Sequence, residues 1–256
     1  MSKKRARQTK RKYVLMFLII AVVTMAGVAL YVLKFKPAYN IARSYIRFVY
    51  IPEGLRREQI ANQFATALGW TNKEKEKLLG IDEGYLFPGI YVVSANAGPS
   101  DISKKLNDAF IKNVIDKQEN LKNKTVDVDT IMKIASIIQR EAAGPQDMEV
   151  ISGIIWNRLF QGMNLDIDAT LQYVKGNEET WWPGVNPEDK SLDSPYNTYK
   201  NVGLPPSPIS NPGEAAINAA LNPAQTKALF YIHDRNRKIH TAETYEQHKR
   251  NIQRYY

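Results

Sequence analysis

The sequence contains no cysteine and only three histidines among its 256 residues. Without cysteine, the chain has no disulfide bridges, no thiol nucleophile and no thiolate-bound metal. His233 and His248 lie seven and eight residues from His240, which does not match the usual spacing of metal ligands. We therefore expect neither a metal site nor a cofactor.

The chain also has little excess of positive charge outside the amino-terminal tail. The formal net charge is +9, but 7 of the 35 basic residues fall within residues 1–12, which leaves 28 basic and 26 acidic residues elsewhere. A nearly neutral remainder does not provide the basic surface that nucleic-acid binding requires. We expect no nucleic-acid partner.

Residues 13–33, YVLMFLIIAVVTMAGVALYVL, contain no charged side chain. As a helix this segment spans roughly 32 Å, enough for the hydrocarbon core of a bilayer. KFKPAYN follows it, not the small residues of a signal-peptide cleavage site. The basic tail favours a cytoplasmic amino terminus. The sequence thus predicts a cytoplasmic tail (1–12), a single transmembrane helix (13–33), a linker (34–43) and an external remainder.

Residues 44–95 have the pattern strand, helix, helix, strand. YIRFVYIPEG is rich in β-branched and aromatic residues and ends in a turn, and GYLFPGIYVVS has the same character. Between them, apolar residues recur at helical spacing, and Thr71 can cap a second short helix. The unit resembles a LysM-like subdomain, a fold often used to hold glycan; a purely structural role is the alternative. Residues 96–124 are predicted to be a connecting helix.

Residues 125–256 are predicted to form a second, mixed α+β subdomain. Two amphipathic helices come first, and from Met163 onward the chain is rich in Pro, Gly and Asn. A further helix, EAAINAALNPA, and a strand, ALFYIHD, follow. Long ordered loops of this kind usually build a functional site. The overall fold class is therefore α+β.

Glu141 ends the run IASIIQREAAG, and helical spacing places it on the same face as Ile134, Ile137 and Ile138. A carboxyl group held against apolar side chains resists ionisation, so its pKa rises toward neutrality. Such a group can act as a general acid near pH 7. The alternative is a structural ion pair with Arg140 or Arg158.

Four segments occur in a specific order: IASIIQREAAG, IIWNRLFQGMNLDIDATLQY, SPYNTYKNVGLPPSPISNPGEAAINAALNP and KIHTAETYEQH. Together with EGYLFPGIY and the tail and anchor, they resemble the YceG/MltG family of membrane-anchored endolytic murein transglycosylases. The resemblance covers most of residues 44–256. It implies a YceG-like catalytic subdomain and Glu141 as the catalytic acid/base.

The resemblance also implies a lyase that acts on a polysaccharide. The enzyme would cleave the MurNAc–GlcNAc bond of nascent peptidoglycan strands near the bacterial cytoplasmic (inner) membrane, form 1,6-anhydroMurNAc ends and so terminate strand elongation. Peptidoglycan glycan strands, the membrane and peptidoglycan synthases (penicillin-binding proteins) would be its partners. Two alternatives remain: a hydrolytic muramidase with Asp166 or Asp168 as a second carboxylate, and a non-catalytic membrane-anchored wall-binding scaffold.

Further residues of these segments are candidates for substrate binding. The set consists of polar and aromatic side chains that follow the second helix or lie in the turn-rich loops: Asn157, Arg158, Asp168, Thr170, Tyr196, Asn197, Tyr199 and His240. Some positions depart from the family pattern. Gln139 stands where an acid is common, and Asp166 stands where Gln is expected, so Glu141 is the acid that remains on the helix.

Overall fold

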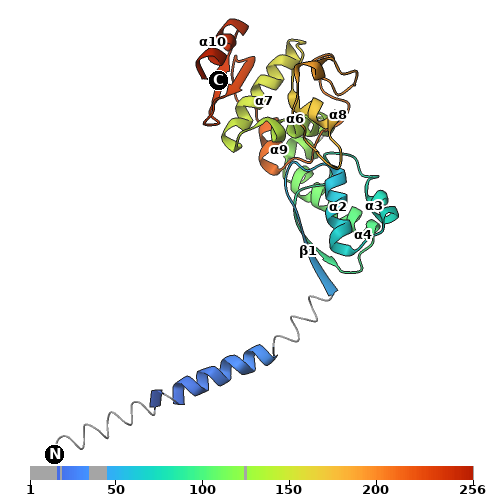
Figure 1. Cartoon of the computed structure of the whole chain (residues 1–256), viewed down its shortest axis with the longest axis vertical. Coiled ribbons are helices and arrows are strands. Elements are labelled where there is room, and N and C mark those ends of the chain that lie inside the picture. The colour runs from blue at the N-terminus through green and yellow to red at the C-terminus, as the bar shows by residue number, and fades with distance from the viewer. Residues whose placement is uncertain (1–15, 18, 35–44, 124–125, 256) are drawn as a thin grey trace, which may run out of the picture. The chain divides into compact units, whose positions relative to one another are not determined.

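The computed structural model of the chain describes residues 16–17, 19–34, 45–123 and 126–255. Contacts divide it into two compact units, one formed by the described residues up to Arg47 with Ser94–Asn96 and the other by Phe48–Val93 with Ala97–Tyr255. Figure 1 labels the elements along the chain. Strands and helices both contribute, so the predicted α+β class is confirmed.

In the first unit, residues 16–17 and 19–34 are helical and expose apolar side chains such as Phe17 and Leu33. The predicted transmembrane helix also includes residues 13–15 and 18, which lie outside the described residues, as do the predicted tail and residues 35–43 of the linker. Across the part of the chain that the structure describes, no helix combines the length and hydropathy needed to cross a membrane.

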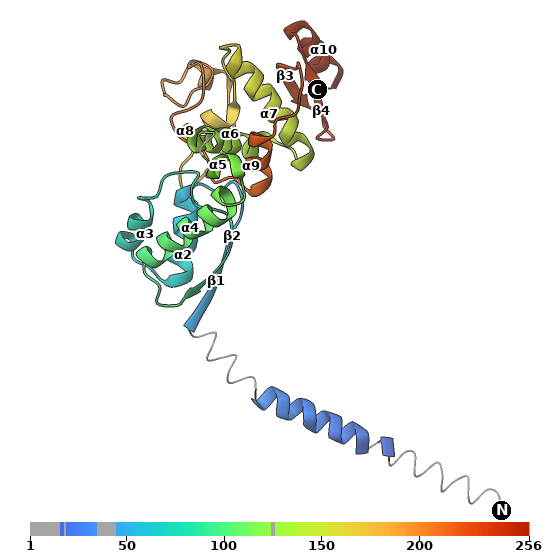
Figure 2. The same cartoon turned by 180° about the vertical axis from the view of Figure 1, so that it is seen from behind.

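Strands β1 (Ile46–Ile51) and β2 (Gly89–Ser94) form a two-stranded sheet, with helices α2 (Arg57–Leu68) and α3 (Asn72–Leu78) between them in sequence. The order strand, helix, helix, strand is therefore as predicted. Figure 2 shows both strands together with the helices that pack beside them. Thr71 caps α3 by accepting a hydrogen bond from the Glu74 backbone N–H, as the sequence suggested.

Helix α4 (Pro99–Phe110) belongs to the core of this small subdomain. Its Ile102 and Leu106 are fully buried in one apolar cluster with residues of α2 and both strands, including Ile60, Phe64 and Val93. A π-helical turn, η1 (Ile111–Ile115), and the short helix α5 (Glu119–Lys122) then lead away from it. The segment predicted as a connector is thus partly a wall of the small core.

The larger core surrounds helix α6 (Val128–Glu141). Helix α7 (Pro145–Phe160) and helix α9 (Glu214–Leu221) both pack on α6, and α8 (Asp168–Lys175) contacts it near its end. The buried face of α9 combines Ile217 with alanines such as Ala216 and Ala220, whose small size lets the helices approach closely. Together these helices bury the isoleucine face of α6 and fix the direction in which its last residue points.

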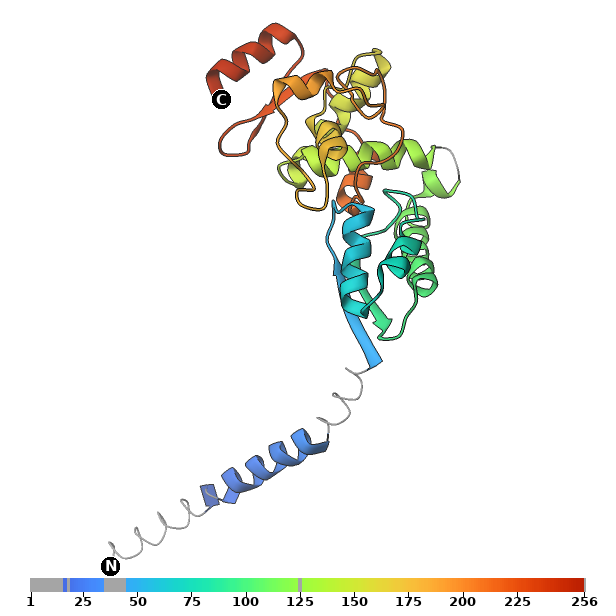
Figure 3. The same cartoon turned by 45° about the vertical axis from the view of Figure 1, so that its right-hand side comes forward.

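The chain ends with an antiparallel hairpin and a helix. Strand β3 (Phe230–His233) pairs with β4 (Ile239–Ala242), with Tyr231 opposite Thr241, and helix α10 (Tyr245–Tyr255) packs against both strands. Figure 3 shows this hairpin and helix in red at the end of the second unit that lies away from α2. The 3-10 helix η2 (Pro187–Ser191) lies in the long turn-rich region between α8 and α9.

Asn211 fastens the small subdomain to the larger one. Its side chain donates to the Leu55 carbonyl (3.0 Å) and to a carboxyl oxygen of Glu83 (2.5 Å), and accepts from the Leu86 N–H (2.8 Å). Its backbone pairs with Gly54 and Leu55. Because Asn211 and Glu83 are both buried, these bonds form in a low dielectric and hold the two parts together.

Candidate active site

Glu141 is the last residue of α6 and continues its buried face. Ile134, Ile137 and Ile138 are fully buried below it, whereas Glu141 itself is half-buried. Burial raises the pKa of its carboxyl group, and the nearby charge of Asp168 raises it further. The carbonyl end of a helix also disfavours a negative charge. The sequence prediction of a carboxyl at the edge of an isoleucine face is confirmed.

Two donors hold the Glu141 carboxyl in place. The Tyr231 hydroxyl donates to Oε2 at 2.7 Å, and the backbone N–H of Ala169 donates to the same carboxyl group. Ala169 lies in the first turn of α8, where backbone N–H groups lack partners within the helix. Both bonds favour the carboxylate form and oppose the effect of burial. The group is therefore positioned and can exist in either protonation state.

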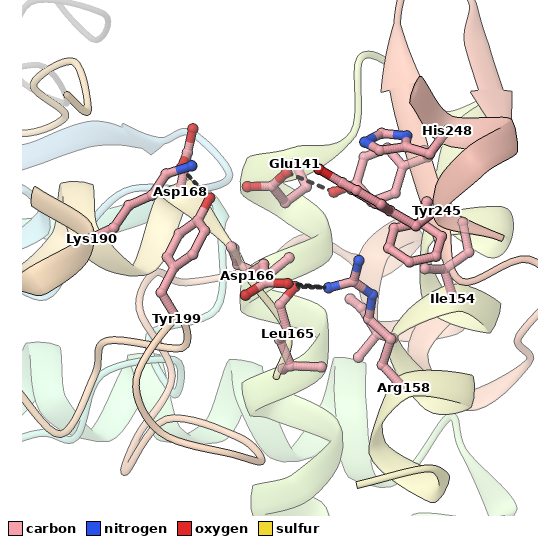
Figure 4. Close-up of a pocket in the computed structure, with 14 residues that line it drawn as sticks. Glu141, Ile154, Arg158, Leu165, Asp166, Asp168, Lys190, Tyr199, Tyr245 and His248 are labelled. Carbon is pink, nitrogen blue, oxygen red and sulfur yellow. Dashed lines mark hydrogen bonds and ion pairs between the residues drawn. The ribbon is translucent and has the colours of Figure 1, made fainter. Parts of the chain in front are cut away.

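Glu141 opens into a cavity of about 450 Å³, a size within the range of roughly 300–1,000 Å³ typical of small-ligand sites. Figure 4 shows the side chains that surround it. They come from α6, α7, α8, β3, α10 and the turn-rich loops: Glu141, Ile154, Ile155, Arg158, Leu165, Asp166, Ile167, Asp168, Lys190, Tyr199, Phe230, Tyr231, Tyr245 and His248.

Two further carboxylates line this cavity, and each has a partner. Asp168, at the start of α8, accepts a 2.6 Å hydrogen bond from the Tyr199 hydroxyl. Asp166 pairs with Arg158 at 3.0 Å. Lys190 extends over the Tyr199 ring, with Nζ 4.6 Å from the ring centroid. The predicted residues Arg158, Asp168 and Tyr199 are thus brought together with Glu141.

Arg158 lies at the cavity, yet its guanidinium is committed to the protein. It donates to the carbonyls of Leu229 (2.6 Å), Asn164 (3.0 Å) and Leu165 (2.8 Å) in addition to Asp166. The side chain is 10% exposed. Its bonds tie α7 to the loop before α8 and to the strand region at β3, so it shapes the cavity wall.

The remaining predicted substrate-binding residues do not line this cavity. Asn157 donates to the carbonyls of Thr226 and Ala228, and Asn197 donates to those of Lys190 and Leu192. Thr170 is fully buried and bonds the Ile167 carbonyl. These three side chains brace the loops that carry the site.

Tyr196 and His240 also lie elsewhere. The Tyr196 hydroxyl is 2.6 Å from that of Ser207, and its ring lines a separate cavity of about 320 Å³ beside Glu83. The ring of His240 stacks on Tyr255, with centroids 3.7 Å apart, and its Nε2 lies 3.0 Å from Asp234.

Several cavity residues were not among the sequence candidates: Lys190, Phe230, Tyr231, Tyr245 and His248. Tyr231 sits in a strand whose residues are all partly buried, so no alternation of polar and apolar side chains singles it out. Tyr245 and His248 are three residues apart and therefore share one face of α10. This pairing can be predicted only once the segment is known to be a helix.

Gln139, the departure from the family pattern on α6, has a structural partner. Its Oε1 accepts the backbone N–H of Gly213 at 2.9 Å, a bond that a glutamate oxygen could equally accept. In the described ranges no group of three His, Asp or Glu side chains is arranged to hold a metal ion. Among the described residues of α6, Glu141 is the carboxyl group that lines this cavity.

The fold and the site define a mixed α+β protein with one positioned, partly buried carboxyl group at the centre of a polar and aromatic cavity. The model of the YceG-like family matches residues 29–254. The chain belongs to the YceG-like family.

Curated relatives and a solved structure are similar to this chain. It is 35% identical over 177 residues to an endolytic murein transglycosylase of Bacillus subtilis, covering 68% of this chain and 48% of that protein. Identity to an endolytic murein transglycosylase of Streptococcus pneumoniae is 32% over 178 residues, 66% of this chain and 31% of that one. The chain thus spans a third to a half of these relatives.

The crystal structure of a YceG-like protein from Listeria monocytogenes matches the fold. The TM-score is 0.70 at 28% identity, and the match covers 79% of this chain and 74% of that one. The small subdomain and the larger one lie within the matched family region.

Proposed function

We propose that this chain is an endolytic peptidoglycan lytic transglycosylase in which Glu141 is the catalytic acid/base. The observation that carries the proposal is the environment of Glu141: a carboxyl group with a raised pKa, hydrogen-bonded by Tyr231, in a cavity of about 450 Å³. The names of the relatives support the same substrate and reaction.

In the proposed reaction, protonated Glu141 gives its proton to the glycosidic oxygen between MurNAc and GlcNAc, and the bond from C1 of MurNAc to that oxygen breaks. The C6 hydroxyl of the same MurNAc then bonds to C1, and the Glu141 carboxylate takes the hydroxyl proton. The products are a free GlcNAc hydroxyl and a 1,6-anhydroMurNAc end. No water is consumed, because the intramolecular hydroxyl has a high effective concentration.

The site suits the two states that Glu141 passes through. Burial favours the neutral acid needed for the first step. The Tyr231 hydroxyl, whose own pKa is raised well above its usual value by burial, remains a donor and stabilises the carboxylate that forms next. One group can therefore serve as acid and base in turn.

A hydrolytic muramidase is the second candidate, because Asp166 and Asp168 line the same cavity. Hydrolases of this kind use a second carboxylate as base or nucleophile. Here Asp166 is paired with Arg158, and Asp168 accepts from Tyr199. Because both carboxyl groups are engaged by protein partners, neither is free to act as base or nucleophile, which favours the transglycosylase. A non-catalytic wall-binding scaffold is disfavoured by the positioned acid.

We also propose a membrane location for the enzyme. The uncharged segment of residues 13–33, with its basic tail, supports a single-pass anchor in the cytoplasmic membrane with the catalytic part outside. The strand, helix, helix, strand subdomain supports a LysM-like module that holds glycan. Cleavage beside the membrane would end the elongation of nascent strands, with peptidoglycan synthases as partners.

The test is strand cleavage by the full chain in detergent, with un-crosslinked glycan strands as substrate. Native protein, Glu141→Gln and Asp166→Asn are compared by liquid chromatography of the products. We expect cleavage by native protein and by Asp166→Asn, and none by Glu141→Gln. Activity in Glu141→Gln equal to native would exclude Glu141 as the acid. Loss of activity in Asp166→Asn as well as in Glu141→Gln would favour the hydrolase.

A further inference from the structure

The cavity around Glu141 has two unlike walls. In Figure 4, Asp168, Lys190 and Tyr199 lie on one side of Glu141, whereas Tyr245 and His248 lie on the other. The first wall carries a carboxylate, an amine and a phenol: Tyr199 donates a hydrogen bond to Asp168, and the Lys190 amine lies over the Tyr199 ring. The second wall is aromatic and comes from β3 and the carboxy-terminal helix α10.

The aromatic wall is a set of three rings in contact. The ring of Phe230 stacks on His248, with centroids 5.3 Å apart and an interplanar angle of 24°. Tyr245 is tilted against Phe230 at 5.9 Å. Arg158 closes the base of the wall, with its guanidinium carbon 5.0 Å from the Phe230 ring centroid. Arg158, which hydrogen bonds to the loop carbonyls fix in place, therefore supports the Phe230 ring.

Most of the Tyr245 side chain is exposed and is not used in packing against the protein. The residue is 59% exposed at the cavity, and none of the residues of α10 is buried. Lys249 lies over the ring at 5.2 Å, so part of one face is occupied, and the rest of the side chain is open to a ligand. Aromatic side chains offered in this way commonly stack on the apolar face of a ligand ring.

His248 has an unused hydrogen-bonding atom at the same wall. Its Nδ1 is buried and finds no partner among the residues that the structure describes. Burial lowers the pKa of the imidazole, and the positive charge of Arg158 lowers it further. The ring lines the cavity, so a ligand hydroxyl or amide can pair with the imidazole.

We propose that the wall formed by Phe230, Tyr245 and His248 is a sugar subsite beside Glu141, where one N-acetylated pyranose ring of the strand stacks on Tyr245 and pairs with His248. This inference rests on the proposed function and names the substrate contacts of its site. The scissile bond then lies over Glu141, with one sugar against the aromatic wall and the next against Asp168, Lys190 and Tyr199. Helix α10 is a substrate-binding element.

The test measures binding separately from cleavage. The full chain carrying Glu141→Gln in detergent is titrated calorimetrically with un-crosslinked glycan strands, alone and with Tyr245→Ala, Tyr245→Phe, His248→Ala or Phe160→Ala added. Phe160 is a matched control, because it is an exposed aromatic residue on α7 outside this cavity. Circular dichroism checks that each variant is folded.

We expect Tyr245→Ala and His248→Ala each to raise the Kd by about fivefold or more, while Tyr245→Phe and Phe160→Ala stay within twofold of the parent. An unchanged Kd in both alanine variants of α10 would overturn the inference, whatever the native chain cleaves. If native protein cleaves nothing while the α10 variants still weaken binding, the proposed function fails and the subsite stands.

Discussion

The hydroxyl of Tyr231 donates a 2.7 Å hydrogen bond to Oε2 of Glu141 and so joins strand β3 to the end of helix α6 across 90 residues of sequence. Burial raises the pKa of both groups. The bond favours the ionised form of Glu141, and burial favours the neutral form. The balance between them determines the pH at which Glu141 loses its proton.

Tyr231→Phe removes that donor, so the pKa of Glu141 should rise further. The free enzyme needs protonated Glu141, so the native enzyme loses activity as the pH rises past the pKa of Glu141. Because that pKa is higher in the variant, the variant should remain active to a higher pH. The carboxylate formed after proton transfer is also less stabilised, and we expect kcat/KM at its maximum to fall about tenfold. A pH profile of kcat/KM on glycan strands measures both effects. An unshifted alkaline limb would contradict the role of Tyr231.

Tyr199 and Tyr196 come from one motif but should respond differently to the loss of a hydroxyl. Tyr199 donates to Asp168 inside the cavity, whereas Tyr196 bonds Ser207 outside it. We expect Tyr199→Phe to lower kcat/KM by about tenfold and Tyr196→Phe to leave it within twofold, with each costing about 1 kcal/mol of stability. Strand-cleavage kinetics and urea unfolding of the pair test this. Equal kinetic losses would mean that the second cavity takes part in catalysis.

The contrast between these tyrosines shows what local pattern can predict. The helix face of Glu141, the cap at Thr71 and the strand order of the small subdomain follow from spacing and propensity within a few turns of chain. The pairing of Glu141 with Tyr231 depends on how β3 packs against α6, and no local pattern contains that information.

The motif residues that the structure places away from Glu141 show the same limit. Asn157, Asn197 and Thr170 are polar residues whose bonds go to backbone carbonyls. Because turn-rich loops leave many backbone groups without partners, a polar side chain there can brace the loop as readily as bind a sugar. Sequence identifies the residue type, and only the fold decides between these uses.

Arg158 should behave as a structural residue. Its guanidinium bonds three backbone carbonyls and Asp166, a geometry that a lysine amine cannot reproduce. We expect Arg158→Lys to lower the free energy of unfolding by about 2–4 kcal/mol, whereas Arg254→Lys on exposed α10 should change it by less than about 0.5 kcal/mol. Urea unfolding measures this. A raised KM at native stability would instead make Arg158 a substrate contact.

Glu83 should make stability depend on pH. Burial raises the pKa of Glu83 from an ordinary 4.5 to about 7 in the folded protein. Below pH 4.5 Glu83 is protonated in both the folded and the unfolded protein. Between pH 4.5 and pH 7 only the unfolded protein loses this proton, so the free energy of unfolding falls by about 3 kcal/mol. Above pH 7 Glu83 is ionised in both states, and its contribution no longer changes with pH.

Glu83→Gln should remove this pH dependence, because glutamine does not titrate. Urea unfolding between pH 5 and pH 8 measures it, with Glu76→Gln on exposed α3 as the control that keeps the native slope. A native decline that persists in Glu83→Gln would assign the effect to another group.

The most direct test of the central claim is digestion of un-crosslinked glycan strands by the native chain in water enriched in oxygen-18, with mass spectrometry of the new ends. The transglycosylase account predicts 1,6-anhydroMurNAc ends that carry no label, formed by native protein and absent with Glu141→Gln. Ends that are heavier by one water and carry a single oxygen-18 would show hydrolysis and would contradict the account.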